Sequence, residues 1–279
     1  MQPSCTGIFI HNKMKYQTIQ FQGKTIHFRI QGEGETIVLL HGFLESLAIW
    51  DTFSKELARD FRVISIDLPG HGQSDTIDAI HSMELMSEVL HEVLVLNSID
   101  RCVIIGHSMG GYVTLAFTAR YPEMTAAISL FHSGALPDTD EAKTNRDRTI
   151  DIVKNNHHHF ISQFIPELFA PDNRERLTIE IAQLQENASK TTSEGIVAAL
   201  SGMRDRSSNL HTLLTLPCPV LFIGGKQDQR IPVDKLLSQA ILPRHAEVLL
   251  LDGCGHMGYL EAEETTLKAI KHFAERILY

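Results

Sequence analysis

The chain has 279 residues, of which 43% are hydrophobic and 21% are charged, and its formal net charge at pH 7 is −9. This length suits one large α/β domain or two small ones, and the composition excludes fibrous and disordered classes. The acidic balance argues against a nucleic-acid partner, because phosphate binding requires a basic surface. No stretch approaches the length of an apolar membrane span, so we expect no membrane partner.

The N-terminus and the cysteines indicate a cytoplasmic protein. Residues 1–13 lack the basic start and the long apolar run of a signal peptide, and we assign residues 1–15 to an N-terminal extension. The cysteines show no CxxC spacing, which predicts reduced thiols that pack as small hydrophobic groups. They are Cys5, Cys102, Cys218 and Cys254.

The first half of the chain alternates predicted strands with predicted helices. Residues 16–31 form two alternating segments that meet at Gly23, which predicts an antiparallel hairpin. Strands buried on both faces are predicted at residues 36–40, 62–67 and 126–131. Apolar residues at helical spacing predict helices over residues 47–59 and 83–96.

The pattern changes between residues 137 and 210, where only helical spacings occur. This segment predicts a helical cap inserted into an α/β domain. Alternation then resumes with strands at residues 219–224 and 247–251 and helices at residues 233–241 and 263–278. The core is therefore expected in two parts, residues 16–136 and 211–279.

Residues 101–121 read as a strand, a glycine-flanked serine and a helix, and the other motifs are arranged around them. Within this stretch, Gly106-His107-Ser108-Met109-Gly110 matches the G-x-S-x-G nucleophile elbow. The strained turn brings the backbone so close that only glycine fits on either side of the serine. The helix that follows directs free N–H groups toward the same place.

A serine nucleophile needs a base and an orienting carboxylate, and the chain provides both downstream. Asp228 and His256 each follow the end of a predicted strand. Three reactive groups at the carboxyl ends of parallel strands converge at one sheet edge, where ligands bind in such folds. An oxyanion hole also requires two backbone N–H groups, and Phe43 and Met109 are the candidates; HGF at residues 41–43 is alternatively a strand-ending turn.

With these motifs the chain resembles the α/β-hydrolase superfamily over residues 16–279, in its helical-capped branch of carboxylesterases, 3-oxoadipate enol-lactone hydrolases and cofactor-free haloperoxidases. The resemblance implies a mostly parallel eight-stranded sheet and the chain order nucleophile, acid, base. Serine at position 108 separates the chain from relatives with aspartate there, and His107 departs from the Gly-Asn-Ser of many C–C bond hydrolases. The motifs are HGF at 41–43, DLPGHGQS at 67–74, GHSMGG at 106–111, GGKQD with Pro232 at 224–232, and GCGH with Glu261 at 253–261.

Other reactive side chains are interpreted as structural. Asp67 also ends a strand at this edge, but the Pro-Gly-His-Gly loop after it explains it more simply than a role as the acid. Consecutive histidines on a helix point in different directions and cannot share a metal ion, so residues 157–159 are expected at the surface. Packing or hydrogen bonding is expected for four more histidines, His41, His71, His107 and His132.

Apolar residues of the cap are expected to form the roof of a substrate pocket. The candidate substrate-binding residues are Trp50, Phe164, Phe169 and Met203, although Trp50 has a spacing that fits core packing equally well. Arg204 and Arg206, near the end of the cap, either meet a substrate carboxylate or solvate a helix end.

The leading hypothesis is a serine hydrolase that cleaves a small, mainly apolar carboxylic ester or lactone through an acyl-enzyme on Ser108. It needs no cofactor and no metal, and we expect a monomer or a homodimer with a small-molecule substrate. The alternatives on the same triad are a perhydrolase or haloperoxidase activity and C–C bond hydrolysis. A ligand receptor that kept the fold is the non-catalytic alternative.

Overall fold

The computed structural model describes residues 15–279. Residues 1–14, with Cys5, lie outside the described residues, so the predicted N-terminal extension is left as a prediction. The first strand begins at Lys15, one residue before the expected boundary. The three described cysteines, Cys102, Cys218 and Cys254, are buried and unpaired.

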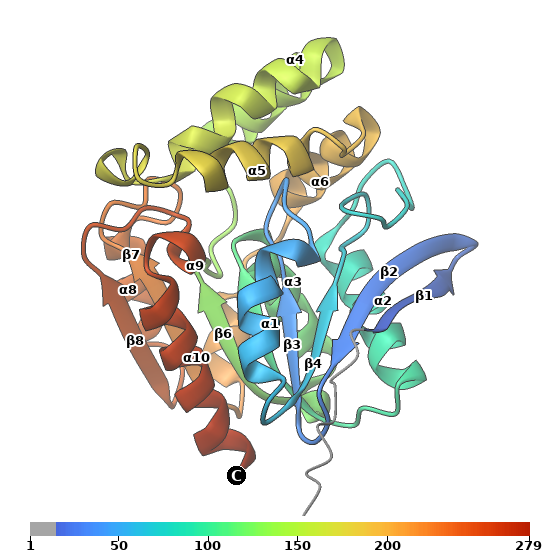
Figure 1. The fold of residues 1–279 in the computed structure, drawn as a ribbon, viewed down its shortest axis with the longest axis vertical. Coiled ribbons are helices and arrows are strands. Elements are labelled where there is room, and N and C mark those ends of the chain that lie inside the picture. Colours follow the sequence, from blue (N-terminus) through green and yellow to red (C-terminus); the bar gives the residue numbers. More distant parts are fainter. Residues whose placement is uncertain (1–14) are drawn as a thin grey trace, which may run out of the picture.

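An eight-stranded sheet organises the molecule, in the order β1-β2-β4-β3-β5-β6-β7-β8 (Figure 1). Strand β2 is antiparallel to β1 and β4, and the other neighbours are parallel, as predicted. The strands are β1 (Lys15–Phe21), β2 (Lys24–Gln31), β3 (Thr36–Leu40), β4 (Arg62–Ile66), β5 (Cys102–His107), β6 (Thr125–Phe131), β7 (Val220–Gly225) and β8 (Ala246–Leu251).

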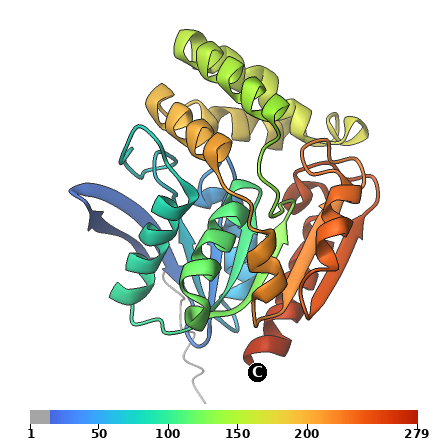
Figure 2. The same ribbon diagram turned by 180° about the vertical axis from the view of Figure 1, so that it is seen from behind.

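Helices cover both faces of the sheet, which is why its central strands are continuous apolar runs. All residues of β3, β5, β6 and β7 are buried. Helices α1 and α10 lie on one face, and α2, α3 and α8 lie on the other (Figures 1 and 2). The core helices are α1 (Asp51–Leu57), α2 (Met83–Leu96), α3 (Met109–Arg120), α7 (Leu210–Thr215), α8 (Val233–Ala240), α9 (Gly258–Glu261) and α10 (Glu263–Leu278), with short 3₁₀ helices η1 (Leu47–Trp50) and η2 (Pro122–Met124).

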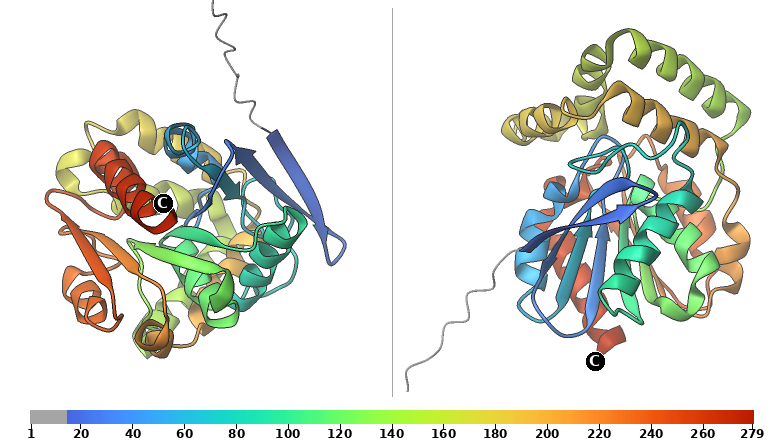
Figure 3. Two further views of the ribbon diagram at one scale, coloured as in Figure 1. Left: turned by 90° about the horizontal axis from the view of Figure 1, so that it is seen from below. Right: turned by 90° about the vertical axis from the view of Figure 1, so that its right-hand side faces the viewer.

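Residues 137–210 contain helices and no strand, and they lie over the carboxyl end of the sheet (Figures 1 and 3). Their long helices stack above the loops that follow β3, β4 and β5. The elements are α4 (Asp140–Phe164), η3 (Ile165–Leu168), η4 (Pro171–Asn173), α5 (Thr178–Ala188) and α6 (Ser193–Asp205). We call this segment the cap; its exact boundaries at 137 and 210 remain predictions.

Backbone contacts hold the cap on the core at two places. The N–H of His81 donates to the Ala198 carbonyl over 3.0 Å, and a Cβ at Gly202 would lie 1.7 Å from the His81 oxygen. The N–H of His256 donates to the Leu168 carbonyl over 2.7 Å. The cap is therefore tied directly to the loop that carries the candidate base.

No helix among residues 15–279 has the length and apolar character needed to cross a membrane.

Candidate active site

Ser108 is the single residue between β5 and α3, and it forms the strained turn that its motif predicts. Its φ and ψ are 49° and −112°, in a region that residues other than glycine rarely adopt. A Cβ at Gly106 would lie 2.4 Å from the Gly110 oxygen, and a Cβ at Gly110 would lie 2.5 Å from the Leu40 oxygen. Glycine is therefore required on both sides of the serine for steric reasons.

The structure brings Ser108, His256 and Asp228 into one hydrogen-bonded chain. His256 Nε2 lies 2.9 Å from Ser108 Oγ, and His256 Nδ1 lies 2.8 Å from Asp228 Oδ2. His256 and Asp228 are buried, whereas Ser108 is half-buried and faces a cavity. These are the distances that proton transfer from a serine hydroxyl to an oriented imidazole requires.

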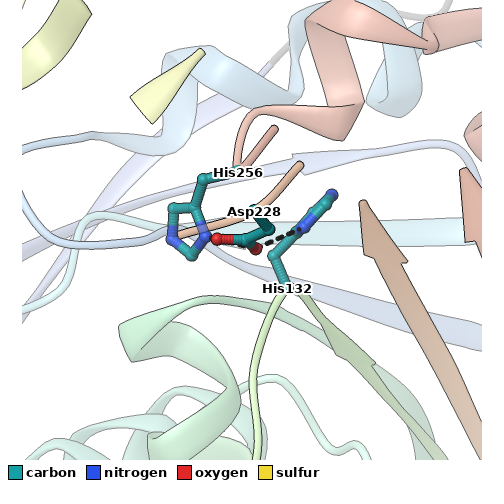
Figure 4. Close-up of side chains that lie close together, drawn as sticks. All are labelled: His132, Asp228 and His256. Atoms are coloured by element: carbon teal, nitrogen blue, oxygen red, sulfur yellow. Dashed lines mark hydrogen bonds and ion pairs between the residues drawn. The ribbon is translucent and has the colours of Figure 1, made fainter. Parts of the chain in front are cut away.

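Asp228 accepts hydrogen bonds at both carboxylate oxygens. Oδ1 accepts from the backbone N–H groups of Arg230 and Ile231, over 2.8 and 3.0 Å. Oδ2 accepts from His256 and also from His132 Nδ1 at 2.9 Å (Figure 4). Burial alone would raise the pKa of Asp228, but the neighbouring His256 and these hydrogen bonds hold it well below its usual range. The carboxylate is therefore ionised at neutral pH.

His132 is the residue whose place in the site the sequence analysis did not find. It directly follows β6 with a φ of 49°, and its N–H donates to the Ile223 carbonyl of β7 over 2.7 Å. Burial lowers its pKa to about 4, so the ring is neutral and its one N–H is the proton donated to Asp228. Its Nε2 has no hydrogen-bond partner among residues 15–279.

His107, next to Ser108, carries a positive charge. Its Nδ1 lies 3.0 Å from Glu45 Oε2 and its Nε2 lies 3.0 Å from the His256 carbonyl oxygen. Both partners are acceptors, so both ring nitrogens donate. Burial alone would lower the pKa of His107, but the Glu45 carboxylate outweighs it and raises that pKa above its usual value. Tyr259 donates to the other oxygen of Glu45 over 3.1 Å, which completes a buried cluster behind the serine.

His41, by contrast, is neutral, and its hydrogen-bond partners show why. Its Nε2 accepts the N–H of Leu68 over 2.9 Å, and its Nδ1–H donates to the Gly42 carbonyl over 2.7 Å. An imidazole that accepts at one nitrogen is neutral, in agreement with a pKa that burial lowers. Burial likewise lowers the pKa of His71 to about 3. These histidines pack and bond, as expected, and neither contacts Ser108.

The N–H groups of Phe43 and Met109 are both free to bind an oxyanion. Met109 is the first residue of α3, and Phe43 follows β3 in a turn. Neither backbone N–H has an acceptor within the part of the chain that the structure describes. The side chain of Phe43 also lines the cavity next to Ser108.

Glu261 holds the turn that carries His256. Its carboxylate accepts the N–H groups of Gly255 and Met257, each over 3.0 Å, and that of Ala170 in the cap over 2.8 Å. The single carboxylate therefore joins the His256 turn to the cap.

Ser108 and His256 open into a cavity of about 770 Å³ between cap and sheet. The substrate-binding candidates Phe164 and Met203 line it, together with Phe160, Leu168 and Leu200. Trp50 and Phe169 do not line it, and this part of the prediction is wrong.

Both residues are buried elsewhere in the molecule. Trp50 is wholly buried in the core, with its ring 5.4 Å from that of Phe53 and 6.0 Å from that of Tyr259. Phe169, itself part of the cap, is 2% exposed and belongs to the cluster of buried apolar side chains. The spacing of Trp50 with Phe53 therefore indicated core packing rather than a pocket wall.

The rest of the cavity wall is polar, which the expectation of a mainly apolar pocket did not include. Arg146 and Arg206 both bind Asp138, and the Arg206 guanidinium lies 4.1 Å from the centre of the Tyr112 ring. All four side chains line the cavity. Arg204 instead forms ion pairs with Asp147 and Asp205 outside it.

Asp67 has a structural environment. Its carboxylate binds His27 Nδ1 at 2.8 Å and accepts the N–H groups of Leu47 and Gln73 over 2.8 and 3.0 Å. It makes no contact with His256. The side chains at 157–159 are exposed or half-exposed on α4, as predicted.

His132, Asp228 and His256 each offer an atom that binds metals, and these atoms lie within 4.8 Å of one another (Figure 4). The same atoms already form the two hydrogen bonds to Asp228 Oδ2. An ion bound at the usual distance of about 2 Å would replace both hydrogen bonds. A metal would thus compete with the Ser108–His256–Asp228 chain rather than assist it.

Comparison with known proteins gives the family. Residues 35–263 match the model of the α/β hydrolase fold family. A 2-hydroxy-6-oxononadienedioate/2-hydroxy-6-oxononatrienedioate hydrolase of Pseudomonas putida is 28% identical over 269 residues, 89% of this chain and 91% of that protein. A match to an uncharacterized protein of Mycobacterium tuberculosis is 36% identical over 124 residues, and covers 43% of this chain and 36% of that protein, so the chain spans about a third of that relative.

Solved structures share the whole architecture. The malate-bound structure of a thermophilic esterase from Thermogutta terrifontis superposes with a TM-score of 0.89 at 28% identity, covering 95% of this chain and all of that one. An enol-lactonase from Burkholderia xenovorans LB400 has the same fold, with a TM-score of 0.86, 22% identity, and coverage of 92% of this chain and 99% of that one. The family match spans most of the chain and both halves of the core, and the protein therefore belongs to the α/β hydrolase fold family.

Proposed function

We propose that the protein is a serine hydrolase that cleaves a carboxylic ester or lactone through an acyl-enzyme on Ser108. The observation that carries this proposal is the chain of hydrogen bonds from Ser108 Oγ through His256 to Asp228 at the wall of the cavity between cap and sheet. The esterase and enol-lactonase among the similar structures support the same reaction class.

In the first half of the reaction, Ser108 Oγ attacks the substrate carbonyl carbon while His256 Nε2 takes the hydroxyl proton. The carbonyl oxygen becomes an oxyanion, and the N–H groups of Phe43 and Met109 stabilise it. Asp228 holds the ring with Nδ1 protonated and stabilises the imidazolium. The C–O bond to the leaving alcohol then breaks, and His256 returns its proton to that oxygen.

In the second half, water replaces the alcohol. His256 takes a proton from the water as its oxygen attacks the acyl carbon, and the proton then goes to Ser108 Oγ as the acyl bond breaks. The products are a carboxylic acid and the free enzyme. For a lactone, the alcohol and the acid are parts of one molecule.

Steady-state turnover of p-nitrophenyl esters tests this proposal. Ser108→Ala is expected to lower kcat by about 10³-fold or more while the protein stays folded. A folded Ser108→Ala variant with wild-type turnover would disprove the role of Ser108. A matched control is Ser133→Ala, because Ser133 lies beside the elbow and donates to the Ser108 carbonyl, but does not contact His256.

C–C bond hydrolysis is the second candidate, and the relative from Pseudomonas putida favours it. The same three residues and the same cavity would serve it, but the substrate is a ketone whose C–C bond breaks after attack. Parallel assays of a p-nitrophenyl ester and a 2-hydroxy-6-oxo dienoate separate the two. If the wild-type protein turns over the dienoate faster than the ester, the preferred substrate class is the C–C bond substrate and not the ester.

A further inference from the structure

The cavity beside Ser108 contains more positive charge than its own acidic residues neutralise. Besides His107, four basic side chains line it, Arg146, Arg206, Arg230 and Lys235, and two acidic side chains, Glu45 and Asp138. This excess contrasts with the whole chain, which has 25 Lys and Arg residues against 34 Asp and Glu residues. The charge at this cavity is therefore a local feature and does not reflect the composition.

The acidic residues of the wall are already bound. Asp138 binds both Arg146 and Arg206, which lowers the pKa of its carboxyl group against the effect of burial. Glu45 binds the positively charged His107. Neither carboxylate contacts Arg230 or Lys235.

Arg230 and Lys235 are thus the two cations of the wall that form no direct ion pair with another described residue. Within residues 15–279, neither side chain makes an ion pair within 4.0 Å or a hydrogen bond, although the carboxylates of Glu167 and Asp228 lie near enough to Arg230 to favour its charged form. Both side chains are exposed at the cavity wall, so each is open to an incoming anion. The one close contact of Arg230 is the Phe164 ring, whose centre lies 4.7 Å from the guanidinium carbon.

The backbone fixes Arg230 relative to the reacting groups. Its N–H donates to Asp228 Oδ1, while Oδ2 of the same carboxylate holds His256. The turn that holds Asp228 against the candidate base His256 therefore also fixes the backbone of Arg230 at the cavity wall. Lys235 follows on the first turns of α8, and Ile231 and Pro232 line the cavity between the two cations.

We propose that Arg230 and Lys235 bind a carboxylate of the substrate, so that the preferred ester or lactone is an anion at neutral pH. This inference rests on the proposed hydrolysis at Ser108 and names its substrate class. A guanidinium presents a planar pair of N–H donors that matches a carboxylate, and the ammonium of Lys235 adds a second charge. The apolar roof of Phe160, Phe164 and Leu200 then holds the carbon chain between the carboxylate and the reacting carbonyl.

The test compares two esters that differ by one charge. The substrates are p-nitrophenyl hemiglutarate and its methyl ester, and the readout is the ratio of their kcat/KM values. The wild-type protein is expected to prefer the hemiglutarate about tenfold or more, because a bidentate charged contact contributes on the order of one to two powers of ten in binding. Arg230→Gln is expected to lower that ratio at least tenfold through KM, and Lys235→Gln to lower it less.

Lys226→Gln is the matched control. Lys226 lies two residues before Asp228 and is paired with Asp252 at 3.6 Å, but it does not line the cavity. Loss of its charge is expected to leave the ratio unchanged. An equal fall of the ratio in Lys226→Gln and Arg230→Gln would show a long-range charge effect and overturn the proposed contact.

A binding measurement keeps the inference separate from catalysis. Calorimetric titration with glutarate is expected to show saturable binding to the wild-type protein and at least tenfold weaker binding to Arg230→Gln, with inorganic phosphate binding more weakly than glutarate. Equal turnover of both esters together with no glutarate binding would overturn the carboxylate site and leave the hydrolase proposal intact. If glutarate binding depends on Arg230 but no turnover depends on Ser108, the hydrolase proposal is overturned and the carboxylate site stands.

Discussion

His132 Nδ1 lies 2.9 Å from Oδ2 of Asp228, the oxygen that also binds His256 at 2.8 Å. The two imidazoles approach one carboxylate oxygen from different elements, His132 from the end of β6 and His256 from the loop after β8. A neutral His132 therefore acts as a second donor to the candidate catalytic acid. It is a positioning residue, because it contacts Asp228 and not the reacting atoms.

Removal of the His132 donor is expected to change the pH dependence of turnover. His132→Leu leaves Asp228 with one less hydrogen bond, so the carboxylate attracts a proton on His256 more strongly and the acid limb of the pH–rate profile moves to higher pH. We expect kcat to fall about tenfold to a hundredfold. His132→Asn keeps an N–H donor and tolerates the positive φ, so it is expected to restore most of the rate.

A purely structural role of His132 would give a different result. It would lower thermal stability and the amount of active protein in both variants, without moving the acid limb. His158→Gln on the exposed surface of α4 is the control for the loss of a histidine.

The two buried aspartates at the sheet edge are expected to respond differently to the same substitution. Asp228→Asn removes the charge that orients His256 and is expected to lower kcat by about 10³- to 10⁴-fold. Asp67→Asn breaks charged hydrogen bonds to His27, Leu47 and Gln73 and is expected to cost on the order of 2–3 kcal/mol in free energy of unfolding with little loss of kcat. Turnover and urea denaturation, measured on both variants, check this, and the reverse pattern would assign the acid to Asp67.

The buried Glu45–His107 pair is expected to stabilise the protein over a defined pH window. The pKa of Glu45 is lowered from 4.5, so its contribution is present above that pH and is lost as pH falls through the folded value. The pKa of His107 is raised from 6.5, so its contribution is full below that pH and is lost as pH rises through the folded value. The stability difference between the wild type and Glu45→Gln is therefore largest between about pH 4.5 and 6.5.

Urea denaturation at a series of pH values measures this difference. We expect about 3 kcal/mol at the maximum, since removal of one partner leaves a buried charge unpaired. Glu88→Gln breaks an exposed pair with Arg120 and is expected to cost less than about 1 kcal/mol at every pH. A Glu45→Gln difference that stays constant from pH 4.5 to 9 would contradict the charged state of His107.

Chelators are expected to leave turnover unchanged. The atoms of His132, Asp228 and His256 that offer metal ligands already hydrogen-bond to one another, and His256 must stay free to accept the serine proton. Turnover before and after dialysis against EDTA checks this. A loss of activity that zinc alone restores would contradict the proposed mechanism.

Local patterns were sufficient to predict most of the fold. Apolar spacing predicted α2 over its observed residues, and continuous apolar runs predicted β3 and β5 because those strands are covered on both faces. The elbow motif predicted the turn at Ser108 because the close approach of Gly106 and Gly110 is a local steric requirement.

The partners behind the site could not be predicted, because they are distant in the sequence. Glu45 and His107 are 62 residues apart, and His132 and Asp228 are 96 residues apart, so no spacing rule relates them. Most of the basic wall was missed for the same reason. Arg206 was considered as a partner for a substrate carboxylate, but Arg146 from the cap and Arg230 from a core loop were not. The spacing of Trp50 was compatible with both the core and the pocket, and only its complete burial in the structure assigns it to the core.

Covalent capture by an electrophilic phosphonate tests whether Ser108 is a nucleophile, because only an activated serine attacks it. The tetrahedral adduct places an oxygen where the N–H groups of Phe43 and Met109 are free. Intact-mass analysis of the wild-type protein is expected to show one adduct per chain at Ser108, with none in Ser108→Ala and much slower labelling in His256→Ala. A folded wild-type protein that forms no adduct with a large or a small phosphonate, or that is labelled equally fast without His256, would contradict the account.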